Sequence, residues 1–203
     1  MYKSLGFPLN KKCSMDDKVI KAAEKKLGVR FPSVLLDYYR VAGNETSFNH
    51  CFQRLLSPKE CFVDQGRLVF MEENQEVVYW GVPASAKLQD DPPVELGVNG
   101  DTVEWYPEAD RCSLFLHVML CYQGAFGGAM QNCATAKVKA SFERSLDSSW
   151  RLVGEVNKMR AFVRQGQAMC FLKWGAEWTI FAGASTPEGL RQIENDCGVK
   201  WKV

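Results

Sequence analysis

Residues 67–82 read RLVFMEENQEVVYWGV, and this stretch decides the fold class. Its two halves, Arg67 to Glu73 and Val77 to Val82, are rich in the Val, Phe, Tyr and Trp residues that strands favour. Asn74-Gln75 lies between the halves. The pattern therefore predicts a β-hairpin.

A second hairpin is predicted around Asn-Gly at positions 99–100, a dipeptide that favours a two-residue type I′ turn. With that turn, Leu96 opposes Val103 on an apolar face. Glu95 then opposes Glu104 on the other face, where like charges destabilise a ladder. A cationic neighbour or partner would explain this pair.

Helical patterns precede and follow the hairpins. Residues 16–27 have acids at the start, lysines along the body and Gly28 at the end, and residues 31–43 form a second helix after a short link. The apolar run 113–122 predicts a buried helix. Further on, the pattern predicts helices at 137–146 and 187–195, and strands at 161–164, 168–174, 177–182 and 199–203. This arrangement predicts an α+β fold.

The composition is that of an ordinary globular protein. The chain has 203 residues, of which 46% are hydrophobic and 24% charged, which fits one domain. No apolar run approaches the length of a membrane span, and the first residues lack the apolar core of a secretory signal. We therefore expect a soluble, cytoplasmic protein whose eight cysteines are mostly buried free thiols.

Charge is distributed unevenly although the net charge is only +1. Residues 1–59 hold 11 Lys+Arg and 5 Asp+Glu, and residues 111–203 hold 12 and 7. Residues 60–110 hold 2 Lys+Arg against 12 Asp+Glu. Such asymmetry indicates a partner chosen by charge. A solvated acidic sheet face without a partner is an equal alternative.

Motifs for catalysis, metals or cofactors are weak. His117 and Cys121 share a helix face and could supply two metal ligands or a thiol with its base, but a core histidine beside packed thiols is the default interpretation. No Cys-x-x-Cys pair or nucleotide-binding loop is present. The sequence thus predicts no enzyme, no cofactor and no metal. Four lysines in the first helix are expected to form a solvated face, not a nucleic-acid site: Lys18, Lys21, Lys25 and Lys26.

Short motifs resemble those of the SUKH superfamily, which includes bacterial toxin-immunity proteins and a fungal regulator of cell-wall synthesis. The opening motifs are Leu27-Gly28, Phe31-Pro32, Tyr38-Tyr39 and Gly43-Asn44. The middle of the chain adds residues 69–75, Tyr79-Trp80, Asp91-Pro92-Pro93-Val94 and the apolar helix around Leu114-Phe115-Leu116. The resemblance covers about residues 16–128. It implies one domain over 1–203, with residues 129–203 as a C-terminal strand and helix elaboration.

What the resemblance implies for the fold is a helical hairpin and further helices packed on one curved, mainly antiparallel sheet, without catalytic residues. For function, it implies an immunity protein that neutralises a cognate toxin, such as a nuclease. The charge distribution agrees, because an acidic surface can occupy a cationic groove. The expected partner-binding residues are Glu72, Glu73, Glu76, Asp90, Asp91, Glu95, Glu104 and Trp105. An intracellular scaffold or regulatory module is the alternative, and core packing is the alternative for the tryptophan.

Overall fold

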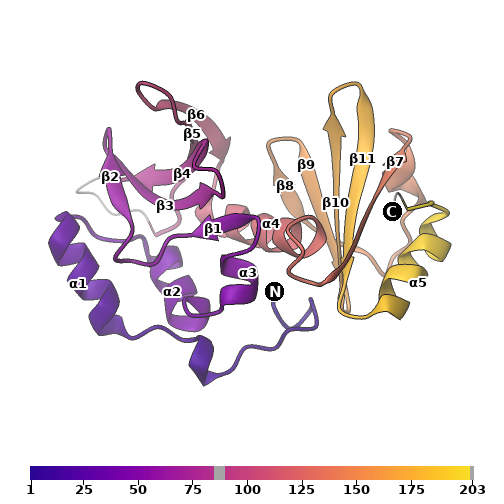
Figure 1. Ribbon diagram of the computed structural model, residues 1–203, viewed down its shortest axis with the longest axis horizontal. Coiled ribbons are helices and arrows are strands. Elements are labelled where there is room, and N and C mark those ends of the chain that lie inside the picture. Colours follow the sequence, from indigo (N-terminus) through magenta and orange to yellow (C-terminus); the bar gives the residue numbers. More distant parts are fainter. Residues whose placement is uncertain (85–89, 202–203) are drawn as a thin grey trace. The chain divides into compact units, whose positions relative to one another are not determined.

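A computed structural model describes residues 1–84 and 90–201 of the chain (Figure 1). The chain divides into two compact units. The first unit is Leu9–Phe115, and the second unit combines Met1–Pro8 with Leu116–Val203. The sequence predicts a single domain whose family-like core ends near Gly128. The division between the two units falls inside a helix, between Phe115 and Leu116.

The first unit carries short helices and a six-stranded sheet, which we call the first sheet. Its helical elements are η1 (Lys11–Cys13), α1 (Asp17–Leu27), α2 (Ser33–Ala42), α3 (Thr46–Asn49) and the first turn of α4 (Cys112–Ala125). Its strands are β1 (Gln53–Leu55), β2 (Phe62–Asp64), β3 (Arg67–Glu73), β4 (Val78–Pro83), β5 (Val94–Val98) and β6 (Glu104–Ala109). Figure 1 shows α1, α2 and α3 on one side of β3 and β4.

Local signals place the first helix where the sequence predicts it. The Asp16 side chain accepts a hydrogen bond from the Lys18 amide, and Gly28 ends the helix with φ 69°, a conformation that glycine adopts without strain. An Arg40–Asp17 ion pair with an Nε–Oδ1 distance of 2.8 Å joins α2 to α1. The predicted helical hairpin is confirmed.

The first sheet is antiparallel, and its strand order is β1-β3-β4-β5-β6, with β2 also on β3. Strands β2 and β6 would lie about 19 Å apart in a flat sheet. Yet Trp105 of β6 donates a hydrogen bond from Nε1 to Asp64 of β2 at 3.0 Å. Gln65 Nε2 also donates to the Val103 carbonyl at 2.8 Å. The sheet must therefore curve, as the sequence resemblance implies.

The register of the second hairpin corrects the sequence prediction. Strand β6 begins at Glu104, which pairs with Val98, while Glu95 pairs with Pro107. The prediction that Glu95 opposes Glu104 is therefore wrong. Residues 99–103 form a longer loop, and neither residue of the Asn-Gly dipeptide has the positive φ that a type I′ turn needs.

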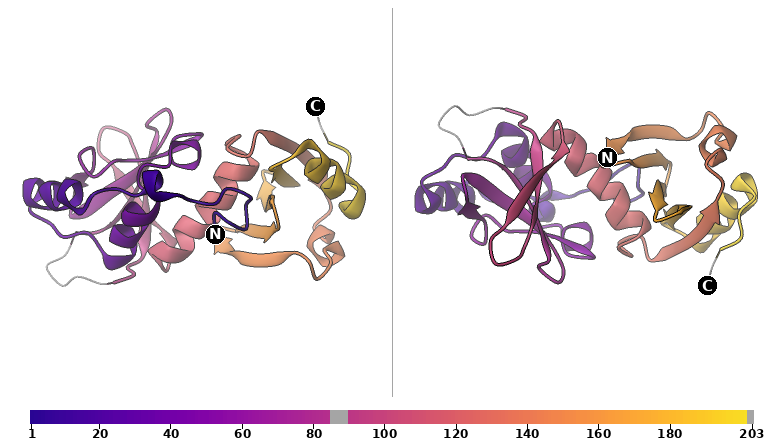
Figure 2. Two further views of the ribbon diagram at one scale, coloured as in Figure 1. Left: turned by 90° about the horizontal axis from the view of Figure 1, so that it is seen from below. Right: turned by 90° about the horizontal axis from the view of Figure 1, so that it is seen from above.

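The second unit contains a five-stranded antiparallel sheet, which we call the second sheet, in the order β7-β11-β10-β9-β8. Its elements are β7 (Asn132–Val138), η2 (Phe142–Ser145), β8 (Arg151–Val156), β9 (Met159–Arg164), β10 (Gln167–Trp174), β11 (Glu177–Ala184) and α5 (Pro187–Cys197). Figure 2 shows α5 beside this sheet in both views. The α+β class is confirmed, but the strands form two sheets instead of one.

The second unit has its own core. Ile180, Phe171 and Ile193 are at most 2% exposed and belong to one apolar cluster between the second sheet and α5. The helix predicted at 137–146 is formed only in part: its first residues extend β7, where Val138 pairs with Trp178 of β11, and η2 is its only helical portion. The strand predicted at 199–203 is not formed at residues 199–201, and its last two residues lie outside the described part.

Within residues 1–84 and 90–201, no helix is both long enough and apolar enough to cross a membrane.

Candidate partner-binding surface

The acidic residues of the first unit divide into those that hold the fold and those that face solvent. Glu72 belongs to the first group, because its side chain is only 8% exposed and is paired with Arg54 on the neighbouring strand. Arg54 Nε donates to Glu72 Oε1 at 2.7 Å, and its Nη1 donates to Glu60 Oε1 at 2.9 Å. A buried carboxylate needs such a partner, so Glu72 is unsuited to bind another protein.

Glu95 is likewise paired within the sheet. Arg67 Nε donates to Glu95 Oε2 at 2.6 Å, and Nη2 donates to Oε1 at 3.4 Å. The same guanidinium carbon lies 5.5 Å from the centre of the Trp105 ring. Arg67 therefore joins a carboxylate to an aromatic ring on one face of the first sheet.

Trp105 is half-buried, and the edge of its indole ring packs against two glycines. A Cβ added to Gly97 would approach the indole Cη2 at 3.0 Å, and one added to Gly81 would approach it at 3.1 Å. Because glycine has no side chain, Gly81 and Gly97 leave space that the indole ring occupies. The hydrogen bond from Trp105 Nε1 to Asp64 joins β6 to β2, so Trp105 closes the curved face of the sheet. It is a packing residue, which is the alternative that the sequence analysis leaves open.

The two aspartates ahead of β5 stabilise helix starts. Asp91 accepts hydrogen bonds from the amide of Ser113 at 2.8 Å and from its hydroxyl at 2.6 Å, at the start of α4. Asp90 accepts from the Ser33 hydroxyl at 2.6 Å, at the start of α2. Negative charge and acceptor oxygens are favourable at these positive helix ends.

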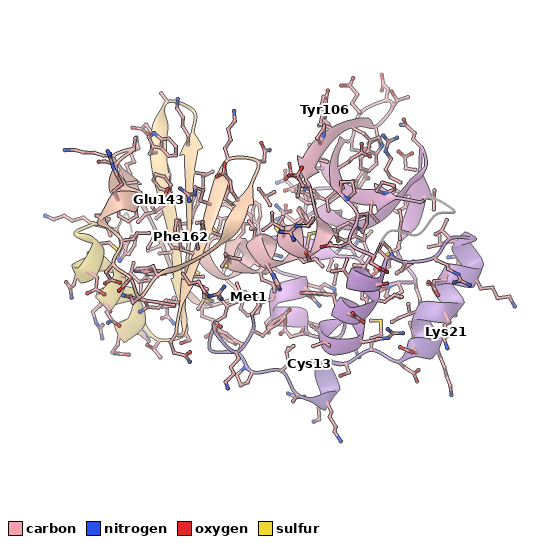
Figure 3. The ribbon with its side chains drawn as sticks, turned by 180° about the vertical axis from the view of Figure 1, so that it is seen from behind. Met1, Cys13, Lys21, Tyr106, Glu143 and Phe162 are labelled. Atoms are coloured by element: carbon pink, nitrogen blue, oxygen red, sulfur yellow. The ribbon has the colours of Figure 1, made fainter. Side chains whose placement is uncertain are left out.

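The solvent-facing acids gather where the two hairpins of the first sheet turn. We define this surface as the hairpin-end patch: Glu73, Glu76, Val77, Val98, Asp101, Glu104 and Tyr106. Its acids are exposed except for Glu73, which is half-buried. Its apolar members are also open to solvent, with Val77 50%, Val98 41% and Tyr106 48% exposed. Figure 3 shows Tyr106 far from Lys21 of α1 within the first unit.

Hydrogen bonds hold the two turns of the hairpin-end patch together. Asn99 donates from its backbone amide to the Val77 carbonyl at 2.9 Å and from Nδ2 to the Glu76 carbonyl at 2.8 Å. Val98 pairs directly with Glu104, and Tyr106 follows Glu104 by two residues. Residues two apart on a strand share a face, so Val98, Glu104 and Tyr106 lie on one side of the sheet.

The patch is rich in uncompensated negative charge. In the described part of the chain, no Lys or Arg forms an ion pair with an acid of the patch. Tyr106 donates its hydroxyl hydrogen bond to Glu104 Oε2 at 2.5 Å. This bond, together with the charge of Glu104, raises the pKa of Tyr106 above its ordinary value.

Two buried cysteines, Cys61 and Cys121, are poor candidates for catalysis or metal binding. Burial raises the pKa of Cys121 to about 12, and it does the same to Cys61. Both thiols are therefore protonated at neutral pH and are poor nucleophiles or ligands. Among residues 1–84 and 90–201, no three His, Cys, Asp or Glu side chains come together as a metal site.

Of the eight partner-binding residues expected from the sequence, the patch contains Glu73, Glu76 and Glu104. The remaining five hold strands or helix ends together. Sequence reasoning missed Asp101, Tyr106 and the two valines. Strand alternation could have identified Tyr106, because it must face away from its neighbour Trp105.

Comparison of the chain with protein-family models, with curated proteins and with solved structures finds no match.

Proposed function

We propose that this protein acts by binding a basic protein partner through the hairpin-end patch, without catalysing a reaction. One observation carries the proposal: three exposed apolar side chains lie among four acids that have no cationic partner in the described residues. An apolar centre with a polar rim is the usual anatomy of a protein interface.

Charge supports a basic partner. The first unit holds 13 Lys+Arg and 17 Asp+Glu, and four of its lysines lie on α1. The acids of the patch therefore attract a cationic surface and repel an anionic one. Nucleic acids and anionic membranes are disfavoured at this surface for the same reason.

The role that fits best is that of a cytoplasmic immunity protein for a toxin with a cationic groove, such as a nuclease. The SUKH-like motifs favour this role, and an acidic protein surface can occupy a groove that is shaped for phosphates. An intracellular scaffold is the second candidate. It is favoured by the second unit, whose separate sheet and core make a further surface available for another partner.

The test is a pull-down from the source cells with neighbouring gene products co-expressed. Glu73→Lys/Glu76→Lys/Glu104→Lys reverses the patch while leaving Arg67 and Arg54 paired. We expect wild type to capture a basic protein and the triple variant to lose at least about tenfold in affinity, since like charges then face each other.

A control with the same change in charge reverses three exposed acids of the second unit, in Glu155→Lys/Glu177→Lys/Glu188→Lys, each of which forms a surface ion pair with a neighbouring Arg or Lys. This variant has the same net charge as the patch variant and should bind as wild type does. Equal losses in both variants would show that only net charge matters and would reject the patch. Capture of a nuclease whose activity is then inhibited would distinguish immunity from a scaffold role.

A further inference from the structure

Two carboxylate–aromatic pairs lie on opposite faces of β6 and its neighbours. On one face, Glu95 and Trp105 share Arg67, whose guanidinium binds the carboxylate and lies over the ring. On the other face, Glu104 and Tyr106 are held together by the 2.5 Å hydrogen bond. Arg67, a residue of the chain itself, is the cation bound by the first pair. The second has none among the described residues.

We propose that the Glu104–Tyr106 pair receives an arginine side chain of the partner. The inference rests on the proposed function, because it specifies which residue of the basic partner the hairpin-end patch selects. The arrangement reproduces what Arg67 does inside the same sheet: its guanidinium donates to a carboxylate and lies over an aromatic ring, 5.5 Å from the ring centre.

Glu104 and Tyr106 both retain groups that can contact an arginine side chain. Glu104 uses Oε2 to accept from Tyr106, and its Oε1 has no partner in the described residues. A carboxylate has about four lone-pair sites, so it can still accept from a guanidinium. Tyr106 is 48% exposed, and its hydroxyl is held by Glu104. The ring therefore offers an open face at little entropic cost.

Arginine fits this pair better than lysine does. A guanidinium is planar, weakly hydrated and able to stack and donate at once, whereas an ammonium is a compact and strongly hydrated point charge. Val98, which pairs with Glu104 in the ladder, adds an apolar surface for the methylene stem of the arginine.

The experiment measures binding of two short peptides, one of alternating glycine and arginine and one of alternating glycine and lysine, with equal length and charge. At low salt we expect wild type to bind the arginine peptide more tightly, by at most about two- to fivefold, since that is the full contribution of an exposed cation–π contact. Tyr106→Leu should remove this preference, and Tyr106→Phe should keep most of it because the ring remains.

Glu76→Gln is the matched control, since it removes one charge of the patch away from the ring. It should weaken both peptides equally and leave the preference unchanged. If wild type binds both peptides equally and the patch reversal abolishes both, the arginine site is wrong and the proposed function stands. If the preference survives in Tyr106→Leu, the ring is not the receptor. If the charge-reversed variant Glu73→Lys/Glu76→Lys/Glu104→Lys binds the peptides as wild type does, the arginine site and the proposed function are both rejected.

Discussion

At the scale of single residues, Gly97 decides whether the curved face of the first sheet can close. An added Cβ would lie 2.7 Å from Val103 Cγ1 and 3.0 Å from the Trp105 ring. Gly97→Ala should therefore lower the free energy of unfolding by about 1–3 kcal/mol, because overpacking costs more than the alanine gains by stiffening the unfolded chain. Urea unfolding measures the change.

Gly100→Ala is the control for this prediction. It lies in the neighbouring loop, and the nearest atom to its added Cβ is 3.7 Å away. We expect this substitution to be neutral or slightly stabilising. Equal losses at both positions would mean that backbone conformation, and not contact with Trp105, sets the cost at Gly97.

The titration of Tyr106 tests the hydrogen bond to Glu104. A neutral phenol that donates to a carboxylate holds its proton, so the pKa of Tyr106 lies above its ordinary value of about 10. Because the folded pKa is raised, the stability from this bond is complete below the unfolded pKa and disappears as pH rises through the folded one.

Ultraviolet absorption follows this titration, with Tyr106→Phe identifying the signal. Glu104→Gln should move the pKa of Tyr106 down toward its ordinary value. Glu73→Gln removes the same charge elsewhere in the patch and should leave the titration in place. If Glu104→Gln changes nothing, the hydrogen bond does not form in solution.

At the scale of helices and strands, local signals predicted much of the fold. Asp16 and Gly28 mark the two ends of α1, and the predicted β3–β4 hairpin forms. The second hairpin was predicted with the wrong register, since the Asn-Gly signal is local. Val103 instead lies against Gly97, where an added Cβ would also meet the Trp105 ring. Strand β7 was missed because its pairing partner β11 comes much later in the sequence, from Val138 paired with Trp178 to Asn132 paired with Ala184.

The candidate site could be predicted only in part for a similar reason. Counting charges identified residues 60–110 as acidic, and the hairpin-end patch does lie there. The count could not separate Glu72 and Glu95, which pair with Arg54 and Arg67, from Glu76 and Glu104, which pair with no cation in the described residues. That distinction requires the register of β1 against β3 and of β3 and β5 against β4, because the side chains that share a sheet face decide which charges are compensated.

At the scale of the whole molecule, each unit has its own sheet and buried residues, so we expect the two units to open separately. Ile180 is fully buried in β11, opposite Phe171 on one side and Ala136 on the other. Ile180→Ala should destabilise the second unit by about 2–5 kcal/mol, through lost burial and the cavity left behind. Hydrogen exchange should then accelerate in β9, β10 and β11, while β3 and β4 keep their protection.

The reciprocal variant, Leu68→Ala, should destabilise the first unit. Leu68 is 1% exposed in β3, so Leu68→Ala should accelerate exchange in the first sheet and leave the second sheet protected. If either variant accelerates both sheets equally, the chain unfolds as one cooperative unit despite its two cores. Separate opening has a functional consequence: Ile180→Ala should then bind the basic partner as wild type does, because the hairpin-end patch belongs entirely to the first unit.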